Sequence, residues 1–325
     1  MEMLLSGKSM MNLLRLIRWK NLVIIAFTMY VMHNCVMYSM LHISEFELQL
    51  NGFYFFLLCL SVLFIAAAGY IINDYFDTGI DTVNKTDKVI IGNSISKDTA
   101  MKFHLAFNFL GIALGYYIGY RSGLTKLGFI HLISAGLLWY YSSDFKKQFL
   151  VGNIIVSILP AFVPLIPGLY EMPLLYVKYS KILEEAGANF NFIAYFLLTY
   201  SAFAFGISLI REIVKDIEDC IGDKEFGRNT LPVSLGVTTT KWIVAVLILG
   251  LMLGIGYFQQ KQYGANDKAS FYYLLFLLQI PFGYILYKLI KSQQEKDYAF
   301  ISTLLKITMM LGISYSFLFS YLLLH

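Results

Sequence analysis

Two acidic motifs with the same spacing are the part of this sequence best suited to chemistry. Asp74, Asp77 and Asp81 come directly after an apolar run, at spacings of three and four residues. The same spacing returns after a later apolar run, in Asp216, Asp219 and Asp223. Side chains three and four positions apart share one face of a helix, so each trio is predicted to present its carboxylates together.

Carboxylates this close need a cation, because two like charges about 6 Å apart repel by roughly 2–3 kcal/mol at an effective dielectric near 20. Magnesium takes one or two carboxylates and leaves coordination positions for substrate phosphates. We therefore predict that all six aspartates ligate Mg²⁺ in a polar cavity, and that Asp74, Asp77, Asp216 and Asp223 are needed for catalysis. The alternative is that they are solvated residues of cytosolic loops. Two trios with basic neighbours, each just beyond an apolar run, favour the metal site.

Basic residues near both motifs are candidates for binding a phosphorylated substrate. Arg211 is best placed, one turn before Asp216, and is predicted to take part in catalysis. Arginine can bind phosphate oxygens with two N–H groups, whereas lysine supplies a point charge. The other candidates are Lys85, Lys88, Lys215, Arg228 and, in a third polar patch, Tyr141 and Lys146. The alternative is that the basic residues only set membrane topology, with the tyrosine as an interface anchor and Lys146 snorkelling to the membrane surface.

The composition predicts a polytopic membrane protein of the all-α class. The chain is 58% hydrophobic and only 14% charged, against about 25% charged in soluble proteins. Without alternating ten-residue segments, the spans are expected to be helices. No basic cluster with interleaved aromatic residues indicates a nucleic-acid partner. Nine apolar spans of about 20 residues lie near 21–41, 53–72, 100–120, 125–142, 149–170, 191–210, 240–258, 271–290 and 300–323.

The distribution of positive charge predicts the orientation in the lipid bilayer. With the N-terminus in the cytoplasm, all but six of the 25 lysines and arginines fall in cytoplasmic segments, as the positive-inside rule requires. We expect an integral protein of the cell (inner) membrane, with both acidic motifs in long cytoplasmic loops at about 73–99 and 211–239. Pro160, Pro164 and Pro167 are expected to kink the fifth span.

A magnesium-loaded, cytoplasm-facing cavity in an apolar bundle suits a ligand with a phosphorylated head and a hydrocarbon tail. A polyprenyl diphosphate has both, and Mg²⁺ would neutralise the diphosphate as its allylic C–O bond breaks. The predicted function is therefore transfer of the prenyl group to a lipophilic acceptor. A membrane transporter or a lipid-binding protein is the alternative of another class. Transporters more often place their carboxylates near the midplane, in broken helices.

Three segments of the chain resemble the UbiA family of intramembrane prenyltransferases. Residues 73–81, beginning Asn73-Asp74, resemble the first signature of that family, and residues 216–223 resemble the second. The patch around Tyr141 and Lys146, with Gly152-Asn153 after it, resembles the third conserved segment. The resemblance implies nine transmembrane helices bundled around a central cavity, two Mg²⁺ ions bridging the motifs and a prenyl diphosphate donor. It also adds Asn73 to the candidate substrate-binding residues.

The resemblance extends to the acceptor and to the domain organisation. Residues 222–232 resemble the digeranylgeranylglyceryl phosphate synthase branch, which implies a geranylgeranyl donor and a prenylated glycerol phosphate acceptor. An aromatic or quinone precursor is the alternative acceptor. Residues 1–325 are expected to form one domain, with spans 2–3 and 6–7 as a pseudo-repeat. The chain departs from the family pattern at two places. It has Lys88-Val89 where many members have Arg-Pro, and its interval from Tyr141 to Lys146 is one residue longer than in some members.

Overall fold

The computed structural model describes residues 7–84 and 89–325, and these are helical apart from turns and a single β-bridge between Ile91 and Ile95. Within these ranges, six helical segments are long and apolar enough to cross a membrane. The number rises to seven if the broken pair α7 (Val151–Phe162) and α8 (Leu165–Lys178) is one span. The chain is therefore an integral membrane protein, in which helices satisfy the backbone polar groups within lipid.

The described residues form two compact units, each assembled from three stretches of sequence. Unit 1 contains residues up to 29, 48–146 and 166–190, and unit 2 contains residues 30–47, 147–165 and 191–325. Each unit carries one of the acidic motifs.

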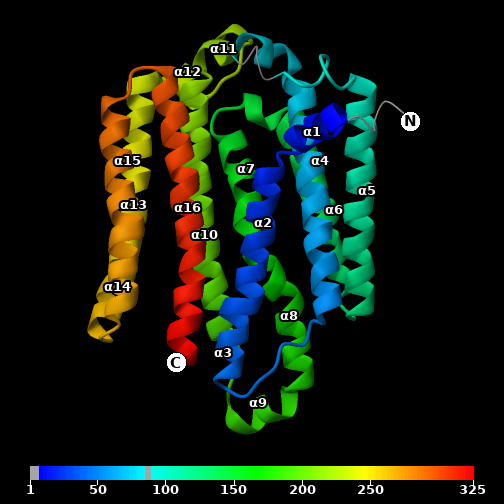
Figure 1. Ribbon diagram of the computed structural model, residues 1–325, viewed down its shortest axis with the longest axis vertical. Coiled ribbons are helices and arrows are strands. Elements are labelled where there is room, and N and C mark those ends of the chain that lie inside the picture. The colour runs from blue at the N-terminus through cyan, green and yellow to red at the C-terminus, as the bar shows by residue number, and fades with distance from the viewer. Residues whose placement is uncertain (1–6, 85–88) are drawn as a thin grey trace. The chain divides into compact units, whose positions relative to one another are not determined.

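Unit 1 is built on three helices that pack against one another in pairs. These are α4 (Gly52–Asn84), α5 (Lys97–Arg121) and α6 (Gly128–Ser143), visible side by side in Figure 1. The unit also holds α1 (Gly7–Leu16), the start of α2 (Trp19–Val31), α8, α9 (Ser180–Ala186) and a 3-10 turn at Thr125–Leu127. Helix α5 begins at an N-cap, because the Ser96 hydroxyl accepts a hydrogen bond from the Thr99 N–H at 3.2 Å.

Close approach of α5 to α4 depends on a glycine. A Cβ atom added at Gly111 would lie 2.6 Å from Ile65 Cγ1 and 2.9 Å from the Ser61 carbonyl oxygen. Ser61 Oγ in turn donates to the Gly111 carbonyl oxygen at 2.6 Å, a polar contact between two helices in the bilayer. Small residues that let helix backbones meet are typical of helix packing in lipid. This contact fixes the position of α4, which carries the first acidic motif.

Unit 2 contains the long C-terminal helices, which run side by side in Figure 1. The long spans are α10 (Asn191–Glu218), α13 (Val237–Gly264) and α16 (Glu295–Leu324), with α14 (Lys268–Leu274) continuing through a π-turn, Leu275–Gln279, into α15 (Ile280–Lys291). The shorter elements are α3 (Tyr38–His42) after the π-turn Met32–Met37, α7, α11 (Cys220–Glu225) and α12 (Leu231–Leu235).

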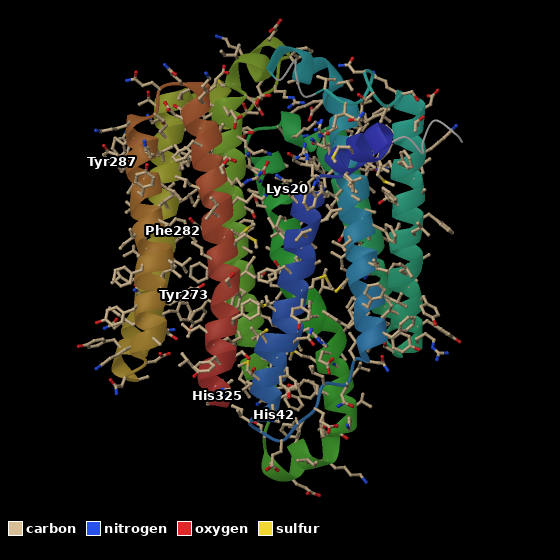
Figure 2. The ribbon with its side chains drawn as sticks, viewed as in Figure 1. Lys20, His42, Tyr273, Phe282, Tyr287 and His325 are labelled. Atoms are coloured by element: carbon tan, nitrogen blue, oxygen red, sulfur yellow. The ribbon has the colours of Figure 1, made fainter. Side chains whose placement is uncertain are left out.

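The core of unit 2 is apolar and well buried. Ile210 and Ile213 of α10 and Ile285 of α15 are fully buried in it. Phe282 of α15 is only 1% exposed, whereas Tyr287 on the same helix is half exposed (Figure 2). Residues of one helix thus divide between an inward face and an outward face, which is the pattern of a bundle whose outer surface meets lipid.

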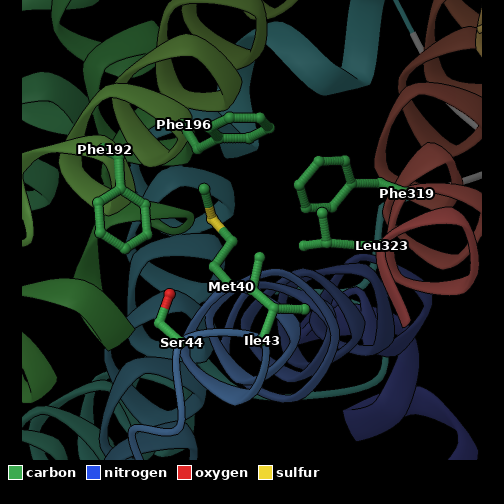
Figure 3. A pocket seen from close by; sticks show the side chains of 7 residues that line it. All are labelled: Met40, Ile43, Ser44, Phe192, Phe196, Phe319 and Leu323. Carbon is green, nitrogen blue, oxygen red and sulfur yellow. The ribbon is translucent and has the colours of Figure 1, made fainter. Parts of the chain in front are cut away.

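Unit 2 contains an apolar pocket of about 340 Å³, whose lining side chains are shown in Figure 3. Phe196 of α10 and Phe319 of α16 line it, with their ring centroids 4.8 Å apart. Met40, Ile43, Ser44, Phe192 and Leu323 complete the lining. Phe196 is twenty residues before Asp216 on the same helix, about 30 Å at 1.5 Å per residue, so this pocket is separate from the acidic motif.

The helices differ from the predicted spans in ways that affect the motifs. Helices α4 and α10 continue past the predicted ends of spans 2 and 6, so Asp74, Asp77 and Asp216 lie on helices. The motif spacing therefore placed Asp74 and Asp77 correctly on a helix, whereas the predicted starts of the loops at 73 and 211 were too early, because polar sequence without proline continues a helix beyond the apolar run. The break in the fifth span is confirmed: α7 ends at Phe162 and α8 begins at Leu165, on either side of Pro164.

Candidate active site

The first acidic motif lies on α4 in unit 1, where Asp74 is paired with a residue from the N-terminal segment. Arg18 Nη2 donates to Asp74 Oδ1 at 2.8 Å, and the guanidinium lies over the ring of Tyr70, 5.1 Å from its centroid. Arg18 occupies the turn between α1 and α2 with φ of 52°. Leu16, buried against Ile71 in a small apolar cluster, holds this turn near α4. The sequence indicated Arg18 only as a topology charge, since no local spacing connects it with Asp74.

Lys146 reaches the same motif from the other side of unit 1. Its Nζ lies 2.8 Å from Asp77 Oδ1 and 3.5 Å from Asn73 Oδ1. The lysine side chain is only 5% exposed and that of Asp77 13%, so water screens this pair poorly. The structure thus brings together three predicted site residues. Tyr141, the fourth member predicted for this region, lies half-buried in the last turns of α6.

Three of the predicted residues cannot be placed in the same detail. Asp81 belongs to α4, but its side chain lies outside the described residues. Lys85 and Lys88 lie outside them entirely.

The second motif, in unit 2, is divided between two helices. Helix α10 ends at Glu218, Asp219 forms a turn with φ of −93° and ψ of 7°, and α11 carries Asp223. The prediction of a single helical trio is therefore wrong for this motif. The backbone stays nearly helical through the turn, because the Asp219 N–H donates to Lys215 O at 2.8 Å and the Asp223 N–H to Asp219 O at 3.0 Å.

Asp216 is held by an asparagine from another helix of unit 2. Asn153 Nδ2 donates to Asp216 Oδ2 at 2.7 Å. Asn153 is buried on α7, and its backbone carbonyl oxygen accepts a hydrogen bond from the Ser157 hydroxyl at 2.5 Å. The amide orients the carboxylate without neutralising it. Asn153 was noted in the sequence only as part of a resembling segment and was not among the predicted site residues.

Asp223 is the most buried carboxylate of the second motif, at 2% exposure. Arg228 Nη1 donates to its Oδ1 at 3.4 Å, and the Arg228 N–H donates to its backbone carbonyl at 2.8 Å. Gly227, with φ of 67°, makes the turn that brings the arginine back to the aspartate. Burial raises the pKa of the nearby Cys220 thiol, and the negative charge of Asp223 raises it further. This cysteine therefore stays a neutral thiol.

Glu212 accepts hydrogen bonds from Arg211 and Lys215, the two predicted basic site residues that lie on α10. Arg211 Nη1 donates to Glu212 Oε1 at 2.8 Å, and Lys215 Nζ donates to Oε2 at 3.1 Å. Glu212 is not among the site residues predicted from the sequence. The sequence signal for Glu212 is its position three residues before Lys215, because oppositely charged side chains at that spacing pair on a helix. Arg211 is its neighbour in the chain. Asp219 is half-buried in the turn that follows.

The carboxylates of both motifs have the chemistry that Mg²⁺ requires. Within residues 7–84 and 89–325, no three acidic, histidine or cysteine side chains gather closely enough to hold an ion by themselves. The donors are nevertheless carboxylate oxygens, the ligands that Mg²⁺ prefers, and a few suffice when substrate phosphates supply the rest. Asp74, Asp77 and Asp223 each already accept from a positively charged group. The fit to a divalent cation thus rests on the carboxylate chemistry of these residues, and the cation would have to share them with the basic groups.

Comparison with known proteins identifies the family. Residues 36–311 match the UbiA prenyltransferase family. The chain belongs to this family. It is 30% identical over 270 residues, 83% of this chain, to the digeranylgeranylglyceryl phosphate synthase of Saccharolobus solfataricus, covering 85% of that protein. It is 37% identical over 199 residues to the digeranylgeranylglyceryl phosphate synthase of Sulfolobus acidocaldarius. That second alignment covers 61% of this chain and spans 63% of the length of the relative.

Solved structures of UbiA proteins share the fold. A structure of digeranylgeranylglyceryl phosphate synthase in membranes superposes with a TM-score of 0.60 at 25% identity, over 98% of this chain and 99% of that one. A UbiA homolog from Archaeoglobus fulgidus bound to GPP and Mg²⁺ superposes with a TM-score of 0.57 at 18% identity, over 94% of this chain and 98% of the other. The family resemblance stated from the sequence is thus confirmed, as is the all-helical membrane fold.

Proposed function

We propose that this UbiA-family protein transfers a geranylgeranyl group from its diphosphate to a prenylated glycerol phosphate. The observation that carries the proposal is the pairing of motif carboxylates with buried or half-buried basic groups at the ends of membrane helices, above all Asp77 with Lys146. Such a group of opposite charges suits a ligand that carries both a metal ion and phosphate oxygens. The relatives named digeranylgeranylglyceryl phosphate synthase support the choice of donor and acceptor.

Magnesium is the proposed cofactor. Asp74 and Asp77 would hold it in unit 1, with Asp81 as a further candidate. Asp216 and Asp223 would hold it in unit 2, with Asp219 beside them. When bound, Mg²⁺ would neutralise the charge that develops on the departing diphosphate. Neighbours solved with Mg²⁺ bound support this choice.

Basic side chains of the chain would bind and orient the diphosphate. Arg211 and Lys215 are half-buried and held by Glu212, which keeps both from swinging into solvent. Lys146, Asn73, Tyr141 and Arg228 are proposed as further contacts, with Lys85 and Lys88 outside the described residues. The allylic C1–O bond would then break with its electron pair going to the diphosphate. The acceptor hydroxyl oxygen would attack C1, and its proton would leave with the diphosphate.

The apolar bundle would exclude water from the allylic cation. Water competes with the acceptor hydroxyl for C1, so an unshielded site would hydrolyse the donor. Aromatic side chains make up 17% of the sequence, and some of them are proposed to face the prenyl chain.

The finer arrangement in the membrane is part of the same proposal. Nine spans result if α5 and α6 also cross, in addition to the six apolar segments and the α7–α8 pair. We propose an N-terminus in the cytoplasm of a cell-membrane protein, and a site that faces the cytoplasm. We also propose that residues 1–325 form a single domain.

The test is a transfer assay with an acceptor panel. Purified protein would be incubated with labelled geranylgeranyl diphosphate, Mg²⁺ and either geranylgeranylglyceryl phosphate or an aromatic quinone precursor, with products identified by mass spectrometry. We expect an ether product with the glycerol phosphate only, loss of activity in EDTA and recovery on adding Mg²⁺. Product with the aromatic acceptor alone would reassign the substrate. Donor movement across vesicles without any product would indicate a transporter.

A further inference from the structure

Within the described residues, the ion pair between Lys146 and Asp77 is one of two well-buried pairs at the motifs, the other being Arg228–Asp223 in unit 2. The lysine side chain is 5% exposed and the aspartate 13%, with Nζ 2.8 Å from Oδ1. In the Arg18–Asp74 pair the corresponding exposures are 36% and 22%. Exposed pairs are screened by water and salt, whereas buried pairs interact strongly. Of the two basic groups that the described residues place on this motif in unit 1, Lys146 is therefore the stronger competitor for a second cation.

The place of Lys146 in the fold keeps this ammonium group beside Asp77. It lies in the 3-10 turn Phe145–Lys147 directly after α6, and α6 packs against α4, which carries Asp77. Its Nζ is also 3.5 Å from Asn73 Oδ1, on the same helix as Asp77. A buried ammonium that leaves a carboxylate must find another anion, because an unpaired buried charge is costly.

We infer that Lys146 and Mg²⁺ compete for the Asp77 carboxylate, so that Lys146 weakens binding of Mg²⁺ alone and transfers its contact to a phosphate oxygen when the metal arrives with a diphosphate. This inference rests on the proposed function, since it concerns the same metal and the same donor. It makes Lys146 a donor-contacting residue that couples metal binding to donor binding. Coupling of this kind is reciprocal, so each ligand raises the affinity for the other.

The test measures Mg²⁺ binding without turnover. The thermal unfolding midpoint of the purified protein would be followed against Mg²⁺ concentration at constant ionic strength, with no donor present. K146M removes the competing charge at nearly unchanged length. We expect its half-saturating Mg²⁺ concentration to fall by about tenfold or more, since a unit charge at this distance acts strongly in a poorly screened site. K147M is the matched control, because Lys147 is exposed and directly follows Lys146. Its replacement should leave the dependence of the midpoint on Mg²⁺ concentration as in the wild type.

Two further variants separate competition from a general structural effect. K146R keeps the charge and should restore the wild-type Mg²⁺ dependence. In a D77N background, adding K146M should change the Mg²⁺ dependence no further, as a double-mutant cycle requires for a contact between these two side chains. If K146M does not fold, K146Q takes its place in both comparisons.

The outcomes distinguish this inference from the function on which it rests. An unchanged or higher half-saturating Mg²⁺ concentration in K146M, while the wild-type protein forms product with Mg²⁺, would overturn the competition and leave the transferase activity standing. Absence of product in the transfer assay would instead remove the proposed function. An equal fall in the half-saturating Mg²⁺ concentration in K146M and K147M would mean that surface charge alone is responsible, which also overturns the inference.

Discussion

Single carboxylates with a defined partner are the smallest parts of this protein on which activity can depend. Asp77 and Asp223 are buried more deeply than Asp74 and lie beside Lys146 and Arg228. Asparagine at any of positions 74, 77, 216 or 223 keeps the shape and removes the charge. We expect each such variant to lose about 10²-fold or more in turnover, the scale of one preorganised electrostatic group. Product formation under saturating donor measures this loss.

E225Q is the control for these variants, because Glu225 is exposed at the end of α11 and lies only two residues after Asp223. Its turnover should match the wild type. Normal turnover in D77N and D223N together with normal folding would rule out a role for either motif in metal binding. Asp219, half-buried in the turn, should be less sensitive, because Glu218 lies beside it.

Arg211 allows charge to be separated from geometry at the residue scale. Its guanidinium is fixed by Glu212 at 2.8 Å, which leaves other N–H groups of the planar fork for a phosphate. R211K keeps the charge and loses the fork. We expect a clear fall in kcat with donor KM only moderately raised, measured by steady-state kinetics. Unchanged kinetics would make Arg211 a topology residue and shift the diphosphate contact to the other basic candidates.

At the scale of elements, the α4–α5 contact decides whether the first motif is held in place. G111A puts a methyl group 2.6 Å from Ile65 Cγ1 and 2.9 Å from a backbone oxygen of α4, where little can move. We expect a loss of about 1–3 kcal/mol in stability, the usual cost of overpacking, seen as a lower thermal midpoint in detergent.

G136A is the matched change on α6, since nothing lies within 4 Å of a Cβ at Gly136. Replacing a helical glycine by alanine gains up to about 1 kcal/mol from helix propensity. The G136A midpoint should therefore stay equal or rise. Equal destabilisation by both variants would show that the α4–α5 approach has no special role.

At the scale of the whole molecule, charge distribution predicts which ends of the helices face the cytoplasm. Single cysteines would replace Glu225, beside the second motif, and Glu184, on α9, in a background without Cys35, Cys59 and Cys220. Both positions are exposed. An impermeant thiol reagent should label position 225 only from the cytoplasmic side and position 184 only from outside. Labelling of both from one side would contradict the proposed topology.

The sequence by itself determined the helical membrane fold and the family. A long apolar run can satisfy its backbone in lipid only as a helix, so α4, α10, α13 and α16 follow from local composition. The break between α7 and α8 follows from Pro164 for an equally local reason. The motif spacing marked Asp74, Asp77, Asp216 and Asp223 because position along the chain is all that such a pattern requires.

Tertiary structure alone decided which groups Asp74, Asp77 and Asp216 meet. Arg18 and Asp74 are 56 residues apart, and Asn153 and Asp216 are 63 residues apart, so no spacing rule connects them. Lys146 was a substrate-binding candidate in the sequence, and its burial beside Asp77 became visible only once α6 was packed against α4. The turn at Asp219 likewise depends on how α11 leaves α10. Such contacts come from the packing of helices, whereas the sequence pattern specifies only the faces that the helices offer.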